Sequence, residues 1–143
     1  MKLRKLGIIG AAGALAISAA VPAFAQAPED PLGVVAIPAG EPLHIGFWGV
    51  LSGADGALGT DSLHGVELAV DAVGGKLLDR VIQLTSEDAL CTPEGGATAG
   101  QKMASDTTLA GLIGSSCSDE TVGGIAALTE AGLTTISPSA TRP

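Results

Sequence analysis

The protein has 143 residues, with fifteen acidic and seven basic side chains and a formal net charge of −8. This length allows one small domain at most. An acidic chain of this kind is repelled by nucleic acids and anionic lipids, so we expect neither as a partner.

Residues 1–25 are typical of a cleaved signal peptide. A basic start over residues 1–5 precedes an apolar stretch that ends near residue 21, and residues 23–25 form an A-x-A cleavage site. The stretch is short and rich in glycine, which favours cleavage after Ala25 over the alternative, a retained membrane anchor. Cleavage would leave 118 residues with four basic and fifteen acidic side chains, a net charge of −11. We therefore predict a periplasmic or secreted protein.

Residues 26–42 are predicted to form an N-terminal arm. A polar tail is followed by a β-branched run over residues 34–37 and a turn over residues 38–42. A lead-in strand and an extended arm both fit the run over residues 31–37.

The first strand and the first helix are predicted after this arm. Residues 43–51 form a near-continuous apolar run, which is typical of a central parallel strand that is buried on both faces. A glycine-rich loop over residues 52–59 follows, and Asp61 is then expected to cap a helix with apolar residues at helical spacing. Gly74 and Gly75 are expected to end this helix.

The second strand, second helix and third strand follow in order. Residues 80–85 alternate apolar and polar side chains, which indicates a strand nearer an edge of the sheet. Thr92 is the predicted N-cap of a helix that has Pro93 at its first position and runs to about Ser105. Residues 109–113 are predicted to form the third strand.

The third helix and the fourth strand complete the pattern. Ser118 is the predicted N-cap, with Asp119 and Glu120 in the first turn, where the helix dipole favours negative charge. Gly132 is expected to end this helix, and residues 133–137 to form the last strand. The alternation predicts an α/β fold in which a parallel sheet carries helices on both faces.

The two cysteines, Cys91 and Cys117, follow the second and third predicted strands. In an exported chain they favour one disulfide, and two free buried thiols are the alternative. A disulfide here would stabilise the fold by about 3–4 kcal/mol. His44 and His64 lack the spacing of a zinc site, so we expect no metal.

The sequence lacks the motifs of common catalytic sites. It contains no G-x-S-x-G, no phosphate-binding G-x-x-x-x-G-K-[ST] and no G-x-G-x-x-G after the first strand. His44 and His64 are interpreted as structural, and Trp48 as a core residue rather than a ligand contact. We therefore expect no enzyme activity and no cofactor.

Ligands of open α/β sheets bind at the carboxyl ends of the strands. The loops expected there are rich in small and hydroxyl residues, and they cover residues 51–60, 88–92, 115–118 and 137–141. Ser118 would also lie at a helix N-terminus, which attracts carboxylates. Capping or turn formation is the alternative role for each serine.

Several motifs stand in an order that resembles the N-terminal lobe of type I periplasmic binding proteins, above all the branched-chain amino acid binding group. They are Leu51-Ser52-Gly53, Gly74-Gly75, Glu87-Asp88 before a cysteine, Gly114-Ser115-Ser116-Cys117-Ser118, Ala131-Gly132-Leu133 and Ser137-Pro138-Ser139-Ala140-Thr141. Residues 43–143 would then be part of the N-terminal ligand-binding lobe, truncated before the hinge and the second lobe.

The resemblance implies a monomeric receptor that closes over a small amino acid or amide and delivers it to the membrane permease of an ABC importer. It places Ser118 against the ligand carboxylate, and Ser139, Ala140 and Thr141 around the polar end of the ligand. Leu58 stands where amino acid receptors often have a tyrosine.

The identity of the ligand and the role of the receptor stay open. Asp119 and Glu120 add negative charge beside the expected anion site, which weakens the case for a simple carboxylate. Amides, urea-like molecules and cationic amines therefore remain alternatives. The same fold also serves as a ligand-sensing receptor ectodomain, and an unrelated secreted α/β enzyme is a third interpretation.

Overall fold

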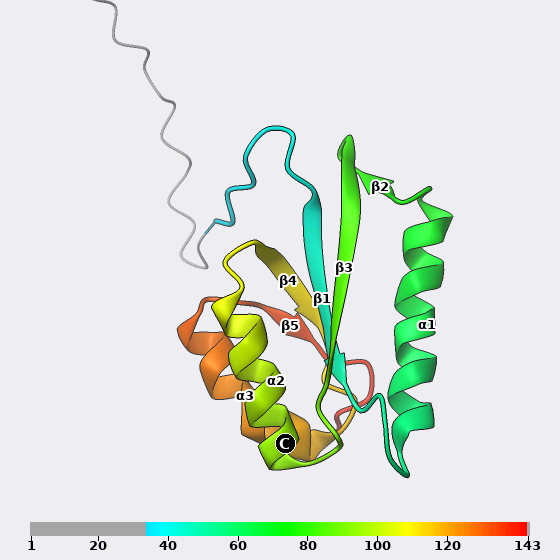
Figure 1. The fold of residues 1–143 in the computed structure, drawn as a ribbon, viewed down its shortest axis with the longest axis vertical. Helices are drawn as coiled ribbons and strands as arrows, with labels where there is room; N and C mark the ends of the chain where they lie inside the picture. Colours follow the sequence, from blue (N-terminus) through cyan, green and yellow to red (C-terminus); the bar gives the residue numbers. More distant parts are fainter. Residues whose placement is uncertain (1–33, 143) are drawn as a thin grey trace, which may run out of the picture.

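The computed structural model describes residues 34–142, so the predicted signal peptide lies outside the described residues. The strands are β1 (Leu43–Gly49), β2 (Lys76–Leu77), β3 (Arg80–Asp88), β4 (Leu109–Ile113) and β5 (Thr135–Ile136). The helices are α1 (Gly56–Ala72), α2 (Pro93–Ser105) and α3 (Ser118–Glu130). The predicted α/β fold, with helices on both faces of a sheet, is confirmed (Figure 1).

The sheet has the strand order β2-β3-β1-β4-β5, with the predicted apolar strand β1 at its centre. β1 pairs in parallel with β3 and β4, and β5 pairs in parallel with β4. The prediction of a wholly parallel sheet is wrong at one edge, because β2 is antiparallel to β3. Leu78 and Asp79 connect these two strands with positive φ angles of 53° and 60°. Such a turn is usually marked by Asn-Gly or Asp-Gly, and this sequence gives no such signal.

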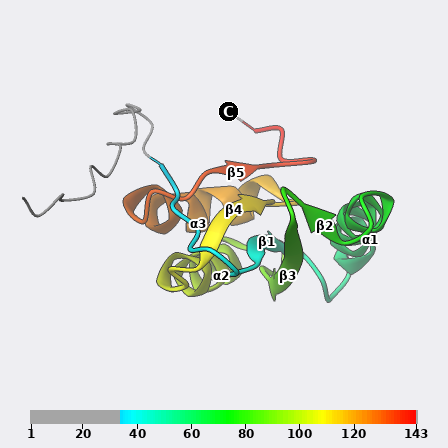
Figure 2. The same cartoon turned by 90° about the horizontal axis from the view of Figure 1, so that it is seen from above.

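The main core lies between the sheet and the pair α2 and α3. Figure 2 shows these two helices on one side of the sheet and α1 on the other. Trp48, Met103 and Leu128 are almost completely buried in this core. The indole N–H of Trp48 donates a hydrogen bond to Thr135 Oγ1 over 3.1 Å, so its predicted role as a core residue is confirmed.

Glycine lets α2 and α3 approach each other closely. A Cβ atom at Gly96 of α2 would lie 2.2 Å from the backbone oxygen of Glu120 in α3. A Cβ atom at Gly124 of α3 would lie 2.6 Å from the Gly96 oxygen. The two backbones are therefore in contact, which fixes the position of the α3 N-terminus.

The prediction that Asp61 caps the first helix is wrong, since α1 begins at Gly56 with Asp55 as its N-cap. Gly56 and Gly59 are buried in its first turn. A Cβ atom at Gly59 would lie only 1.8 Å from the carbonyl oxygen of Val50, just after β1. Glycine has a low helix propensity, which is why these residues were predicted to form a loop. They are required in the helix because its first turn packs directly against the backbone of Val50.

The other boundaries differ by smaller amounts. β3 continues to Asp88, three residues beyond the predicted strand, and β5 covers only two of the five predicted residues. Residues 34–37 form no strand. Arg80 instead holds this arm through hydrogen bonds to the carbonyl oxygens of Ile37, Pro38 and Glu41. Among residues 34–142, no helix is both long enough and apolar enough to cross a membrane.

Candidate functional site

The carboxyl end of the sheet gathers the loops that the sequence predicted to bind a ligand. The loops after β3 and β4 are joined by the predicted disulfide between Cys91 and Cys117, whose Cα atoms lie 5.3 Å apart. Thr92 caps α2 as predicted, because its hydroxyl oxygen accepts a hydrogen bond from the backbone of Gly95 over 3.0 Å. This end of the sheet is therefore covalently braced.

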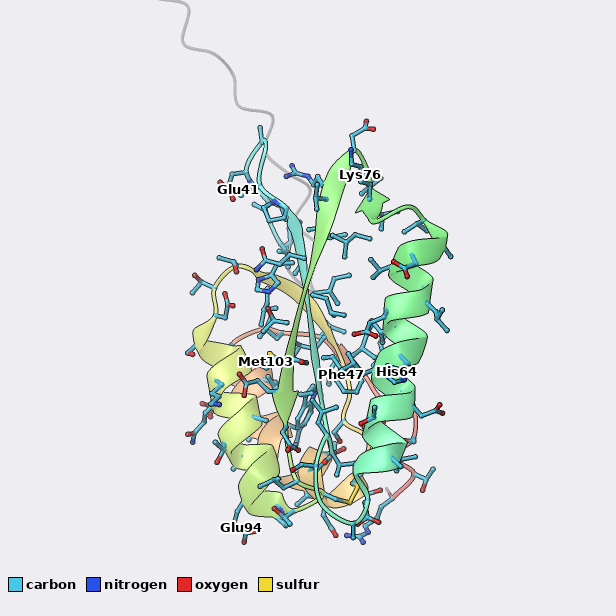
Figure 3. All side chains as sticks on the ribbon, turned by 45° about the vertical axis from the view of Figure 1, so that its right-hand side comes forward. Glu41, Phe47, His64, Lys76, Glu94 and Met103 are labelled. Carbon is cyan, nitrogen blue, oxygen red and sulfur yellow. A yellow bond between two sulfur atoms is a disulfide. The ribbon has the colours of Figure 1, made fainter. Side chains whose placement is uncertain are left out.

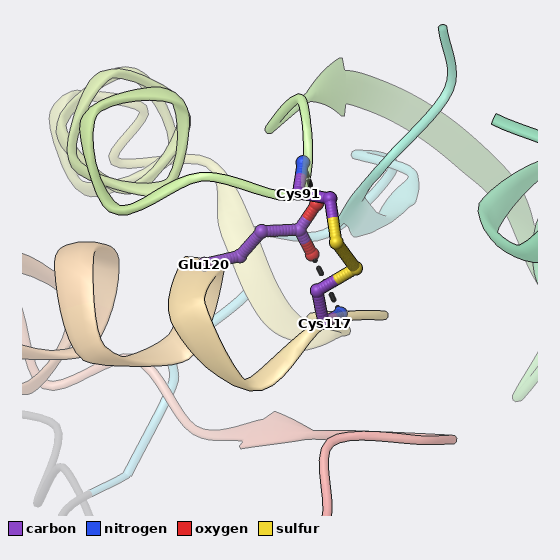
Figure 4. A group of neighbouring side chains, drawn as sticks. All are labelled: Cys91, Cys117 and Glu120. Carbon is purple, nitrogen blue, oxygen red and sulfur yellow. Dashed lines mark hydrogen bonds between the residues drawn. A yellow bond between two sulfur atoms is a disulfide. The ribbon is translucent and has the colours of Figure 1, made fainter. Parts of the chain in front are cut away.

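Glu120 lies beside the disulfide and is completely buried (Figure 4). Its carboxylate accepts three backbone hydrogen bonds, from Cys91 over 2.8 Å, from Ser116 over 3.1 Å and from Cys117 over 2.8 Å. These bonds satisfy both oxygens of the buried side chain, and no salt bridge joins Glu120 to a basic group within residues 34–142. The Glu120 side chain thus points inward and joins the same two loops as the disulfide, so the negative charge that the sequence placed beside the expected anion site is buried beneath it.

Ser118 does not cap α3, because Cys117 is the N-cap and Ser118 is the first helical residue. The Ser118 hydroxyl oxygen instead accepts hydrogen bonds from the backbone N–H groups of Thr141 and Arg142, over 3.2 Å and 3.1 Å. Both lone pairs of the oxygen are therefore engaged. What Ser118 can still offer to a ligand is the proton of its hydroxyl group.

Ser137 organises the loop after β5 and engages two of the predicted contacts. Its hydroxyl donates to the Ser115 carbonyl over 2.7 Å and accepts from the backbone of Ser139 and Ala140, over 3.3 Å and 2.8 Å. The Ser139 hydroxyl donates to the Ser116 carbonyl over 2.6 Å. In this structure the polar groups of Ser139 and the N–H of Ala140 therefore hold the loop together.

Thr141 differs from Ser139 and Ala140 because its side chain does not take part in the hydrogen bonds of the loop. Its backbone N–H is bound to Ser118, its side chain is exposed, and within residues 34–142 its hydroxyl makes no hydrogen bond. Ser118 and Thr141 are thus the two predicted contacts whose hydroxyl groups remain able to donate to a ligand.

Two acidic side chains at the carboxyl end of the sheet, Asp88 and Asp119, are bound by neighbouring groups. Asp88 is partly buried, which disfavours its charge, but hydrogen bonds from the Ser52 hydroxyl and from the backbone of Leu51 and Leu90 outweigh burial and lower its pKa. Asp119 forms an ion pair with Arg142. Asp88 is therefore held as an anion, and the charge of Asp119 is balanced by Arg142.

The remaining candidates of the sequence have structural roles. His44 is buried, and its two ring nitrogens each lie 2.7 Å from a threonine hydroxyl, in Thr108 and Thr85. Glu87 pairs with Lys102 at 2.7 Å. The described part of the chain brings Cys91, Cys117 and Glu120 together, but the sulfurs are bonded to each other and the carboxylate oxygens are occupied.

The sequence analysis did not foresee the buried role of Glu120 or the part that Arg142 plays at this end of the sheet. Glu120 stands three positions after Cys117, which is the spacing of a capping box. The motif was not recognised in the sequence because cysteine is an unusual N-cap residue. Arg142 follows the Ser-Pro-Ser-Ala-Thr motif, and only the fold brings it beside Asp119.

Loss of the disulfide is expected to destabilise the fold. Replacing Cys91 and Cys117 by serine should lower the free energy of unfolding by about 3–4 kcal/mol, because the unfolded chain is no longer cross-linked. Urea denaturation of the exported protein, with and without reductant, would measure this. The double variant should match the reduced protein, and equal stability of the oxidised and reduced forms would contradict the prediction.

The family model of the periplasmic binding proteins matches residues 42–143. No curated protein sequence matches the chain. Solved structures with the same fold include an ABC transporter substrate-binding protein from Sphaerobacter thermophilus, with 30% identity and a TM-score of 0.66. The alignment covers 70% of this chain and 27% of that protein.

Two further solved structures carry a named ligand. The branched-chain amino acid transporter substrate-binding protein LivJ from Streptococcus pneumoniae, in complex with isoleucine, is 29% identical, with a TM-score of 0.66 and coverage of 71% of this chain and 30% of its own. A solute-binding protein of an ABC transporter from R. palustris, in complex with benzoate, is 29% identical, with a TM-score of 0.62 and coverage of 69% and 28%. The chain thus spans less than a third of these neighbours. By the match of the family model, the chain belongs to the periplasmic binding protein family.

Proposed function

We propose that this chain is the N-terminal part of the solute-binding component of an ABC importer, and that its ligand is a small amino acid or a related small molecule. The observation that carries the proposal is the pairing of Ser118 and Thr141 at the carboxyl end of the sheet, 3.2 Å apart from oxygen to backbone nitrogen. Solute-binding proteins with isoleucine or benzoate as ligand share this fold.

The proposed binding chemistry is donation by two hydroxyl groups. The lone pairs of Ser118 are occupied, which leaves its proton to be donated, and the Thr141 hydroxyl is unbound within the described residues. Both groups can donate to an oxygen of the ligand. Ser139 and Ala140 would then contribute mainly by shaping the loop, because Ser137 and Ser116 already engage their polar groups.

The remaining parts of the proposal concern the complete receptor. Residues 1–25 would direct export and be cleaved near Ala25, residues 26–42 would form an arm, and residues 43–143 would contribute part of the first lobe. The receptor would act as a periplasmic monomer, deliver its ligand to the membrane permease and catalyse no reaction. Membership of a family of binding proteins supports this non-enzymatic role.

Binding measurements on the complete receptor test the two hydroxyl groups. Thr141→Val keeps the shape of the side chain and removes a hydrogen bond, so the affinity should fall by about tenfold or more. Ser118→Ala should have an effect at least as large, because it also leaves two backbone N–H groups without an acceptor.

Thr129→Val is the matched control for Thr141→Val. Thr129 lies near the other end of α3, and its hydroxyl donates to the Ile125 carbonyl within the helix. Isothermal titration calorimetry should show unchanged affinity for this control. If Thr141→Val and Ser118→Ala also bind the ligand as tightly as the parent, these residues do not form the binding site.

A further inference from the structure

The N-terminus of α3 already carries two acidic side chains where a ligand anion would bind. The dipole of a helix places about half a positive charge at its N-terminus. The carboxyl group of Glu120 lies at this terminus, is completely buried and accepts the backbone N–H groups of Ser116 and Cys117, which a ligand anion would otherwise bind. Asp119, in the same turn, adds a second carboxylate. A ligand carboxylate at Ser118 would therefore meet a negative field unless another group compensates it.

Arg142 is the basic residue placed to do so. Its backbone N–H donates to Ser118 Oγ over 3.1 Å, which fixes the residue beside a proposed ligand contact. The other Lys and Arg side chains of residues 34–142 are engaged or distant. Arg80 binds the arm and Lys102 pairs with Glu87. Lys76 lies at the opposite end of the molecule from Glu94, which is in the first turn of α2 (Figure 3).

The guanidinium of Arg142 retains most of its binding capacity. One of its nitrogens is paired with Asp119, and the side chain of Arg142 is 60% exposed. A guanidinium has five N–H donors and binds carboxylates with two parallel hydrogen bonds. An exposed ion pair contributes little stability, so exchanging or sharing Asp119 with a ligand carboxylate costs little.

We propose that Arg142 is a specificity-determining residue that makes the site prefer a carboxylate ligand over its uncharged amide. The inference rests on the proposed function, and it narrows the ligand from amino acids, amides and amines to molecules with a free carboxylate. Isoleucine and benzoate, the ligands of two structural neighbours, both carry this group. Asp119 competes with the ligand for Arg142 and thereby limits the affinity.

Two pairs of probes that differ in the acid group test the preference. Calorimetry on the complete receptor would use isoleucine with isoleucinamide, and benzoate with benzamide. At least one acid should bind the parent protein more tightly than its amide. Arg142→Gln should weaken binding of that acid by about tenfold and change binding of the amide by less than about twofold. Asp119→Asn should strengthen binding of the acid.

Lys76→Gln is the control, because it removes the same charge at the far end of the molecule. It should leave both affinities unchanged. The inference is overturned if neither acid binds the parent, if an amide binds as tightly as its acid, or if Arg142→Gln affects acid and amide alike.

The variants of Ser118 and Thr141 distinguish a failure of the proposed binding site from a failure of the role proposed for Arg142. If they leave binding unchanged, the proposed site itself fails. If they weaken the binding of acid and amide, while Arg142→Gln changes the affinity for the acid and for its amide equally, the binding site stands and the role proposed for Arg142 is wrong.

Discussion

Glu120→Gln is expected to lower the free energy of unfolding by about 3 kcal/mol, because it leaves buried N–H groups without an acceptor. One carboxylate oxygen of Glu120 accepts from Cys91, and the other accepts from Ser116 and Cys117. An amide has a single oxygen, so its NH2 group must face at least one of these N–H groups. The charge that strengthens the remaining bonds is also lost.

Urea denaturation with the disulfide intact measures this loss, and Glu130→Gln provides the control. Glu130 is the last residue of the same helix and is exposed, so its substitution should change the stability by less than about 0.5 kcal/mol. Equal stability of the two variants would mean that the buried carboxylate does not hold the two loops together.

Gly59→Ala is expected to destabilise the protein by about 3 kcal/mol or more, although alanine normally favours a helix over glycine by about 1 kcal/mol. The new Cβ atom would lie 1.8 Å from the carbonyl oxygen of Val50. Backbone atoms at the end of the central strand cannot move aside as a flexible side chain can. The first turn of α1 would have to separate from the backbone that follows β1.

Gly65→Ala in the same helix is the matched control and should have the opposite sign. Nothing lies within 4 Å of a Cβ atom at Gly65, so the substitution should stabilise α1 by about 0.5–1 kcal/mol. Thermal and urea denaturation of the two variants would compare them directly. If Gly59→Ala is also stabilising, α1 does not pack on β1 in the way described.

Apart from the disulfide, the features predicted correctly are those that neighbouring residues specify. The apolar run that became β1 and the Thr92-Pro93 start of α2 are local signals, since burial on both faces and capping depend on side chains within one segment. The disulfide followed from an exported chain with two cysteines, because only one intramolecular pairing exists.

The starts of α1 and α3 depended instead on contacts between distant segments. Gly59 lies in the first turn of α1, where its backbone packs against Val50 and leaves no room for a side chain, a requirement that helix propensity does not contain. Glu120 points inward because Cys91, 29 residues away, presents an N–H group to it. In both cases packing or hydrogen bonding across the fold overrides the local preference.

The loops of the proposed site show the same division. The sequence by itself determined that small hydroxyl residues such as Ser118 and Thr141 gather at the carboxyl end of a sheet, because strands that alternate with helices are parallel and the loops that follow them lie at one edge. Only the tertiary structure decided that Ser139 turns to Ser116, and that Arg142 joins Asp119 beside Ser118. The physical reason is that hydrogen bonds and ion pairs between loops depend on distances in space, which spacing along the chain does not fix.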